Sequence, residues 1–240
     1  MESKNKIARI AGLLYLIVVL AGIFSLMYVP SKVIVWNDPS ATYTNILNSE
    51  SLFRLGIVAG VICYTAFLVL PLVLYKLLSS VNKTYAVAMV VLAIISVPLS
   101  LVNLLNKVNI LTLIRRADYM KVFDTSKIQA EVLLYLDFYN NGLKITSIFW
   151  GLWLLPFGYL VFKSGFLPKI IGILLMVGCF GYLINFLGGF LFQHYKDLGI
   201  STFISLPATI GEIGICFWLL IIGIKHKKEP QVSVNSLPTL

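Results

Sequence analysis

Six long apolar stretches constrain the fold of this chain more than any other feature of its sequence. A helix rises about 1.5 Å per residue, so about 20 mostly apolar residues cross the hydrocarbon core of a bilayer. Such windows occur at roughly 7–29, 52–78, 85–106, 143–162, 168–191 and 203–224. The sequence therefore predicts an all-α polytopic membrane protein, with one six-helix transmembrane domain over residues 1–225 whose partner is the lipid bilayer.

The composition supports lipid as the solvent. Hydrophobic residues make up 59% of the chain and charged residues only 12%, whereas soluble domains have about 25% charged residues. A soluble fold of this composition would expose large apolar patches. The first window is too long for the apolar core of a cleaved signal peptide, and no A-x-A site follows it, so we expect it to be retained as a helix.

The distribution of charge predicts the orientation. Ten basic residues lie before the first window, between windows two and three, between four and five, or after the sixth: Lys4, Lys6, Arg9, Lys76, Lys83, Lys163, Lys169, Lys225, Lys227 and Lys228. The same regions hold two acidic residues, Glu2 and Glu229. The positive-inside rule then places both termini in the cytoplasm of a cell whose plasma membrane holds the protein. Because the basic residues form no single patch, we expect no nucleic-acid binding.

Two of the segments between windows are long enough to hold further structure. Asp38 followed by Pro39 has the pattern of an N-cap and first residue, which predicts a short helix near 39–48. Ser126 and Gln129 have the spacing of a capping box, and apolar residues then recur at helical spacing. This pattern predicts an amphipathic helix over 127–139 at the outer interface.

We expect that amphipathic helix to end before the fourth window. The sequence at 140–142 is Asn-Asn-Gly, whose residues tolerate the left-handed backbone of a helix end. An unbroken helix over 127–162 would also be about 54 Å long, well beyond the thickness of a bilayer. Residues 226–240 are polar and include two prolines, which predicts a disordered cytoplasmic tail.

Motifs of catalysis, metal binding and nucleotide binding are missing from the sequence. The two histidines, His194 and His226, fall in a loop and in the tail, and no HExxH, G-x-S-x-G, GxGxxG or P-loop pattern occurs. The three cysteines, Cys63, Cys179 and Cys216, lie far apart in apolar windows, as small packing residues do. We therefore expect no metal, no cofactor and no catalytic residue.

Glu212 is the first candidate for a functional residue. It lies near the middle of the sixth window, where an ionised carboxylate costs about 3 kcal/mol on insertion scales. Pro207 lies upstream, and Gly211 and Gly214 allow close neighbours. Glu212 is either a proton- or ligand-binding carboxylate or a neutral acid that hydrogen-bonds across a helix interface.

Further polar residues collect in the outer half of the predicted bundle. Ser96, Ser100, Asn103 and Lys107 recur along one face of the third helix, and Asn140, Lys144, Ser147 and Gly151 along one face of the fourth. With Arg54 and Asn185, these residues could line a pocket that opens outward above Glu212. In the alternative, Arg54, Lys107 and Lys144 extend to the outer headgroups, which we favour for Lys107, while the other residues join helices.

Several segments together resemble one known family. They are the opening run from Arg9 to Leu16, the run from Phe53 to Ile57, the run from Phe149 to Lys169, and Gly211-Glu212-Ile213-Gly214. Over about residues 5–225 the chain resembles bacterial multi-pass membrane proteins of "domain of unknown function 4386". The resemblance implies a bacterial plasma-membrane location and the same number of helices, but no reaction and no functional residues.

Three functions fit these observations. The first is non-enzymatic binding or transport of a small molecule or ion through an outward-facing polar cavity, with Glu212, Arg54, Asn103, Lys144 and Asn185 as candidate contacts. The second is a structural or regulatory subunit of a membrane complex. The third, an intramembrane enzyme acting on lipid, is disfavoured because no nucleophile–base pair is recognisable.

Overall fold

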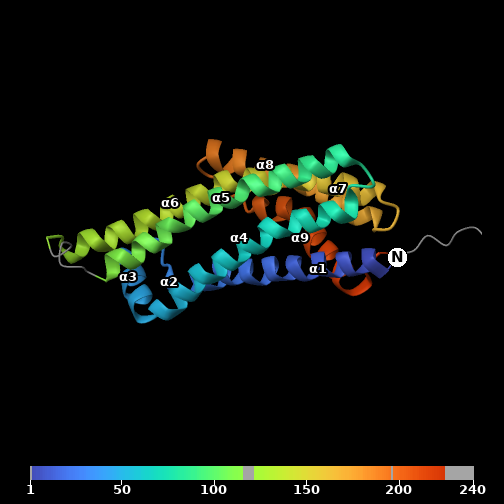
Figure 1. Cartoon of the computed structure of the whole chain (residues 1–240). Coiled ribbons are helices and arrows are strands. Elements are labelled where there is room, and N and C mark those ends of the chain that lie inside the picture. Colours follow the sequence, from blue (N-terminus) through green and yellow to red (C-terminus); the bar gives the residue numbers. More distant parts are fainter. Residues whose placement is uncertain (1, 116–121, 196, 225–240) are drawn as a thin grey trace, which may run out of the picture.

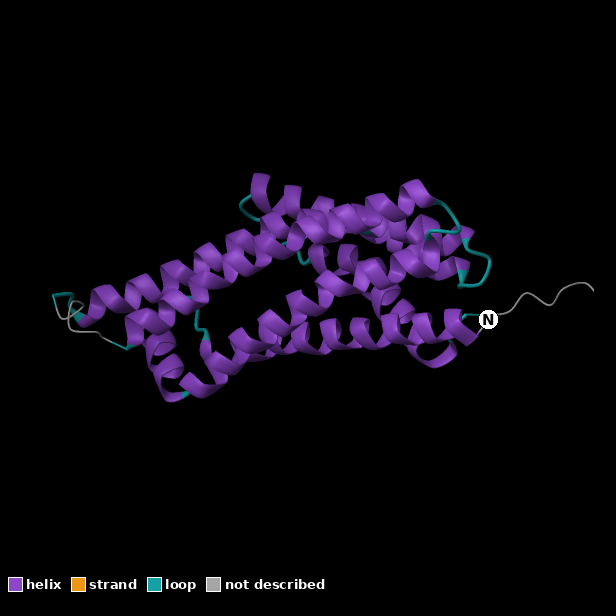
Figure 2. Cartoon of the chain, in the orientation of Figure 1, coloured by secondary structure: helices purple, strands orange, loops and turns teal. Residues whose placement is uncertain are grey.

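The computed structural model describes residues 2–115, 122–195 and 197–224, with the side chains of residues 2 and 3 left out. Every regular element in these ranges is a helix, which confirms the predicted all-α class (Figures 1 and 2). The helices are α1 (Glu2–Ile23), the π-helix η1 (Phe24–Tyr28), α2 (Val29–Val33), α3 (Pro39–Asn48), α4 (Glu50–Leu78), α5 (Lys83–Ile114), α6 (Thr125–Leu152), α7 (Leu154–Lys163), α8 (Lys169–Leu191), α9 (Ile200–Phe217) and the π-helix η3 (Trp218–Ile222).

Six helical segments of the described chain are long and apolar enough to cross a membrane. They are Lys4–Val33, Glu50–Leu78, Lys83–Ile114, Thr125–Lys163, Lys169–Leu191 and Ile200–Ile222. Each of the six predicted windows coincides with one of them, which confirms the predicted number. The predicted tail at 226–240 lies outside the described residues.

The six segments alternate in direction along the long axis of the molecule (Figure 1). The start of α1 and the end of η3 lie at the same end, where the Asn5 side chain accepts a hydrogen bond from the backbone N–H of Ile224 at 3.0 Å. The opposite end, here called the distal end, holds α2, α3, the end of α5 and the start of α6. α5 has 32 residues, or about 48 Å, so it is longer than the roughly 30 Å core of a bilayer.

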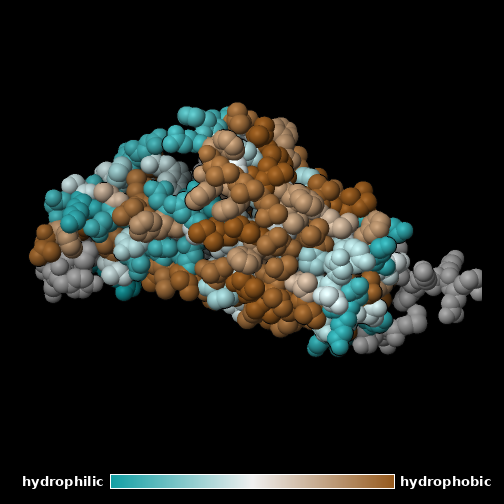
Figure 3. All heavy atoms as spheres, turned by 90° about the horizontal axis from the view of Figure 1, so that it is seen from above, coloured by the Kyte–Doolittle hydropathy of each residue, from teal (hydrophilic) through white to brown (hydrophobic). Residues whose placement is uncertain are grey.

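Apolar side chains also cover the middle of the surface. Figure 3 shows a broad hydrophobic region there, with hydrophilic residues toward both ends of the molecule. Large apolar side chains within the six segments, such as Leu20, Leu105 and Phe180, are exposed in the isolated chain. This pattern is what a bilayer around the six segments requires.

The predicted break after residue 139 is wrong, because α6 continues as one helix from Thr125 to Leu152. The Asn-Asn-Gly sequence at 140–142 stays helical. Gly142 serves packing instead, since a Cβ atom there would overlap the carboxamide of Asn103 on α5. The helix is interrupted only at Trp153, before α7 begins.

The two predicted helix starts have different outcomes. α3 spans Pro39–Asn48 with Asp38 as its N-cap, whose side chain accepts from the Ala41 N–H at 2.8 Å, as predicted. The capping box at Ser126 is wrong. The N-cap of α6 is Asp124, which accepts from the Lys127 N–H at 2.8 Å, while the Ser126 hydroxyl donates to the same carboxylate.

Two apolar cores hold the helices together. The larger surrounds Trp153, which is fully buried; its ring stacks on Phe157 at 5.0 Å between centroids and meets Phe67 edge-on at 5.1 Å. The smaller core lies at the distal end and joins α2, α3, α5 and α6 through residues such as Ile46 and Val132. The distal helices are therefore a packed part of the fold.

Candidate binding site

Lys107 is the most unusual polar residue of the described chain. It lies on α5, its side chain is only 2% exposed, and no described carboxylate oxygen lies within 4.0 Å of its ammonium group. Nζ instead donates to the backbone carbonyl of Ser25 at 3.1 Å and lies 4.2 Å from the centroid of the Tyr139 ring. The favoured expectation that Lys107 extends to the headgroups is therefore wrong, because the side chain turns into the bundle.

The local sequence of η1 and α2 explains why the Ser25 carbonyl is free to accept this bond. Ser25 lies in η1, where the N–H of Val29 bonds to Phe24. In a π-helix the carbonyl of Ser25 would bond to the residue five positions on, but that residue is Pro30, which has no N–H. The combination of a π-turn and a proline thus leaves one carbonyl oxygen aimed at Lys107.

A cavity of about 240 Å³ lies beside Lys107 near the distal end. We call it the Lys107 cavity. It is lined by Leu26, Pro30, Ile34, Trp36, Lys107, Leu136, Tyr139, Asn140 and Leu143. Most of this wall is apolar, and Lys107 is its one charged residue, so the cavity combines a buried positive charge with an apolar surface.

Asn103 holds one wall of the cavity in place. Its side-chain amide donates to the backbone carbonyl of Tyr139 at 2.8 Å, and its side-chain oxygen accepts from Asn106 at 3.1 Å. Ser96, Ser100, Asn103 and Lys107 are all buried, so the predicted polar face of α5 does point inward. Tyr64 and Tyr139 are buried as well.

Glu212 belongs to a different cluster, between α1, α8 and α9. Tyr15 donates to Oε1 at 3.1 Å and Tyr182 to Oε2 at 3.4 Å. Tyr15, the residue of α1 that contacts Glu212, lies ten residues before Ser25, which contacts Lys107. This separation is about 15 Å along the helix axis. The lining of the Lys107 cavity does not include Glu212, so Glu212 is not the floor of that cavity.

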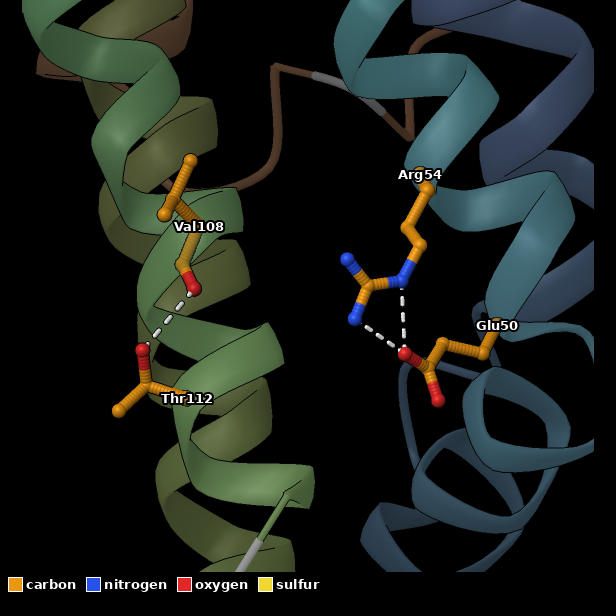
Figure 4. A network of polar contacts seen from close by, with 4 residues as sticks. All are labelled: Glu50, Arg54, Val108 and Thr112. Carbon is orange, nitrogen blue, oxygen red and sulfur yellow. Dashed lines mark hydrogen bonds and ion pairs between the residues drawn. The ribbon is translucent and has the colours of Figure 1, made fainter.

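The other predicted residues are spread over three places. Arg54 forms an i,i+4 ion pair with Glu50, and its guanidinium points from α4 toward α5 (Figure 4). Lys144 donates to the Asn141 side chain on its own helix at 2.9 Å. The Asn185 amide donates to the Ser205 hydroxyl of α9 at 2.8 Å, which joins α8 to α9. The structure brings Asn103 together with Lys107, but does not gather all five predicted residues into one site.

The partners of the two ionisable residues were not identified from the sequence. Tyr15 and Tyr182 are ordinary members of apolar windows, and Tyr139 belongs to the predicted amphipathic helix, so only their tertiary placement makes them partners. Ser25 carried a usable signal, because a serine five residues before a proline marks a carbonyl that a π-turn would leave free.

No group of three or more metal-ligating side chains occurs among the described residues. Cys63, Cys179 and Cys216 are free thiols, each buried. Cys63 and Cys216 lie close to backbone carbonyls of α1, Val18 and Gly12 respectively. These thiols thus pack between helices of the described chain.

The fold and these sites define a class: an all-helical protein with six segments suited to a bilayer and polar side chains buried between them. More specifically, the chain belongs to the family described as Domain of unknown function (DUF4386), whose pattern matches residues 10–223. This match confirms the resemblance seen in the sequence.

One relative has a similarly uninformative name. The chain is 38% identical over 84 residues to an "Uncharacterized protein" of Archaeoglobus fulgidus, a match that covers 35% of this chain and 47% of that protein. The match thus spans about half the length of that relative. No solved structure matches the chain.

Proposed function

We propose that the protein binds a small organic anion, without converting it, in the Lys107 cavity. One observation carries the proposal: a lysine that is 2% exposed, with no described carboxylate in reach, forms part of a cavity wall. An ammonium group buried without a counter-ion loses several kcal/mol of hydration. A carboxylate or phosphate group in the cavity would offset that loss.

The lining defines the chemistry of the ligand. The volume of 240 Å³ is below the roughly 300–1,000 Å³ of pockets for drug-sized ligands, so the ligand is small. Trp36 and the aliphatic side chains favour an apolar body, and Asn140 offers a side-chain amide for a second polar group. The ligand class is a small amphipathic monoanion.

Orientation and location are part of the proposal. The described acidic side chains other than Glu212 all belong to the distal half of the fold, whereas Lys4, Lys6 and Arg9 lie at the opposite end. The positive-inside rule then places the termini in the cytoplasm, the cavity toward the outside, and the protein in the bacterial plasma membrane. Maleimide labelling of a Ser40→Cys variant in intact cells tests this, because a membrane-impermeant reagent reaches only an outward residue.

The remaining predicted residues have secondary roles in this proposal. Asn103 positions Tyr139. Arg54 is paired with Glu50 and Lys144 bonds to Asn141, and neither residue belongs to the lining of the Lys107 cavity. Glu212, with its two tyrosine donors, is a candidate proton-binding group separate from the cavity. A Glu212→Cys variant that an impermeant maleimide labels would support access of water to it.

The decisive experiment compares two variants of the purified full-length protein. Benzoate, short-chain carboxylates and methyl phosphate are tested for stabilisation against heat, each beside its neutral amide or ester. At a ligand concentration 100 times Kd the expected stabilisation is about 2.7 kcal/mol. Lys107→Met should abolish it, whereas the control Lys144→Met should retain it. Equal stabilisation by the neutral analogues, or an unchanged response in Lys107→Met, would refute the proposal.

A structural or regulatory subunit is the second candidate. The distal core of α2, α3, α5 and α6 favours it, because this packed unit extends past the length that a bilayer covers. In that case Lys107→Met would leave assembly and function unchanged.

An enzyme is the third candidate. Two hydroxyls lie within reach of Glu212, but the lining of the Lys107 cavity does not include Glu212.

A further inference from the structure

A second cavity lies at the opposite end of the molecule, between α1 and η3. We call it the α1–η3 groove. It has a volume of about 660 Å³ and is lined by Asn5, Lys6, Arg9, Ile10, Leu13 and Leu220. It is larger than the Lys107 cavity, and neither shares a lining residue with the other. Whatever it binds is therefore independent of the anion proposed above.

The groove changes from cationic to apolar along α1. Lys6, Arg9 and Leu13 are three and four residues apart, so they share one face of the helix. Lys6 and Leu13 are about 10 Å apart along the axis. Lys6 and Arg9 lie near the start of the first membrane segment, which begins at Lys4. Leu13 and Leu220 lie further inside the first and last segments. This order matches a molecule with an anionic head at the interface and a hydrocarbon body in the bilayer.

The two cations have no partner of opposite charge among the described residues. Lys6 and Arg9 are both exposed, and neither forms an ion pair with a described carboxylate. The Ile10 and Leu13 side chains, 42% and 52% exposed, continue the same face. The groove thus places two positive charges directly beside an exposed apolar surface.

The walls of the groove are held by close contacts between α1 and the end of the chain. Gly12 packs against the backbone of Leu219 and Leu220, since a Cβ at Gly12 would lie 2.7 Å from the Leu220 Cα. Asn5 accepts from the N–H of Ile224 at 3.0 Å. All six lining residues belong to α1 or η3, so helices form the walls of the groove.

We propose that the α1–η3 groove binds one anionic glycerophospholipid. The headgroup phosphate contacts Lys6 and Arg9, and the upper part of an acyl chain lies along Ile10, Leu13 and Leu220. Basic pockets between membrane helices on the cytoplasmic side are suited to such headgroups. Each basic residue contributes about 1 kcal/mol of attraction, so two give about a thirty-fold preference over a zwitterionic lipid.

The test uses the full-length protein in a neutral detergent. Native mass spectrometry measures binding of phosphatidylglycerol, phosphatidylcholine and glycerol phosphate, the last as a soluble source of the same phosphate. The variant is Lys6→Gln/Arg9→Gln. The matched control is Lys163→Gln/Lys169→Gln, which removes the same charge from the α7–α8 connection, at the same end of the bundle.

We expect phosphatidylglycerol to bind about thirty-fold more tightly than phosphatidylcholine, and the first variant to lose that preference while the control keeps it. Leu13→Ser should weaken lipid binding without creating a preference for phosphatidylcholine. Equal losses in both double variants would overturn the proposal, because they would indicate general attraction to a basic surface. Glycerol phosphate binding as tightly as the lipid would also overturn it, because the apolar half of the groove would then contribute nothing.

Discussion

Replacement of Gly142 by alanine tests the packing between α5 and α6. In an open helix this change stabilises, because glycine costs about 0.5–1 kcal/mol relative to alanine. At Gly142 the new Cβ would overlap the carboxamide of Asn103, whose Nδ2 would lie 2.8 Å away. Asn103 is 8% exposed, and this amide donates to the Tyr139 carbonyl. The new methyl group would therefore push the amide off its acceptor.

The contacts give the magnitude. A buried amide that loses its partner costs about 1–3 kcal/mol. If Asn103 stays in place instead, α5 and α6 must separate, and such overpacking also costs about 1–3 kcal/mol. The higher helix propensity of alanine offsets up to about 1 kcal/mol of this cost. We therefore expect Gly142→Ala to lower the free energy of unfolding by roughly 1–2 kcal/mol.

Gly189→Ala is the matched control. Gly189 also lies within a helix, α8, but a Cβ there would meet no atom within 4 Å. It should raise the free energy of unfolding by about 0.5–1 kcal/mol. Unfolding of both variants is followed by circular dichroism in the same detergent. If Gly142→Ala were as stable as Gly189→Ala, the close contact and the explanation of Gly142 as a packing residue would both be wrong.

Three further changes test other parts of the fold. Trp153→Ala should cost about 3–5 kcal/mol of stability in the same assay, whereas Trp153→Phe, which keeps a ring in the core, should cost less than about 1.5 kcal/mol. Glu212→Gln should change stability little, because its oxygen still accepts from Tyr15, whereas Glu212→Ala leaves two hydroxyls unpaired at about 1–3 kcal/mol each; an unfolded Glu212→Gln would contradict this. The hydrogen bond from the Lys127 N–H lowers the pKa of Asp124. The helix cap should therefore persist above the ordinary pKa of aspartate and be lost as the pH falls through the lowered pKa. The NMR chemical shift of the Lys127 amide should report this loss.

The sequence was most informative where one physical constraint dominates. Backbone groups in lipid must be satisfied within the helix, so a long apolar window has a single outcome. All six windows became helices for this reason. The helix at Pro39–Asn48 was predictable because its start depends on local interactions only. The N-cap and the fixed φ of proline both lie within four residues of the chain.

Local patterns failed where tertiary contacts compete with them. The residues at 140–142 favour a helix end, yet α6 continues because Gly142 lets α5 approach. Lys107 was expected to reach the headgroups, because the sequence gives its depth but not the direction of its side chain. The free carbonyl of Ser25, which draws the ammonium inward, exists only in the folded π-turn.

The placement of Lys107 and Glu212 bears on why the bundle keeps either residue. A buried cation and a buried carboxylate would offset each other most if they were paired. Here both contact the first membrane segment, Lys107 at Ser25 in η1 and Glu212 at Tyr15 in α1, about 15 Å apart along its axis. Each is satisfied by neutral groups, a carbonyl and a ring for Lys107 and two hydroxyls for Glu212. Packing alone gives no reason to keep two separate unpaired charges, because apolar residues of similar size would fill the same space at lower cost. An anion beside Lys107 and a proton on Glu212 would each supply the missing charge, and the variants above test the two residues separately.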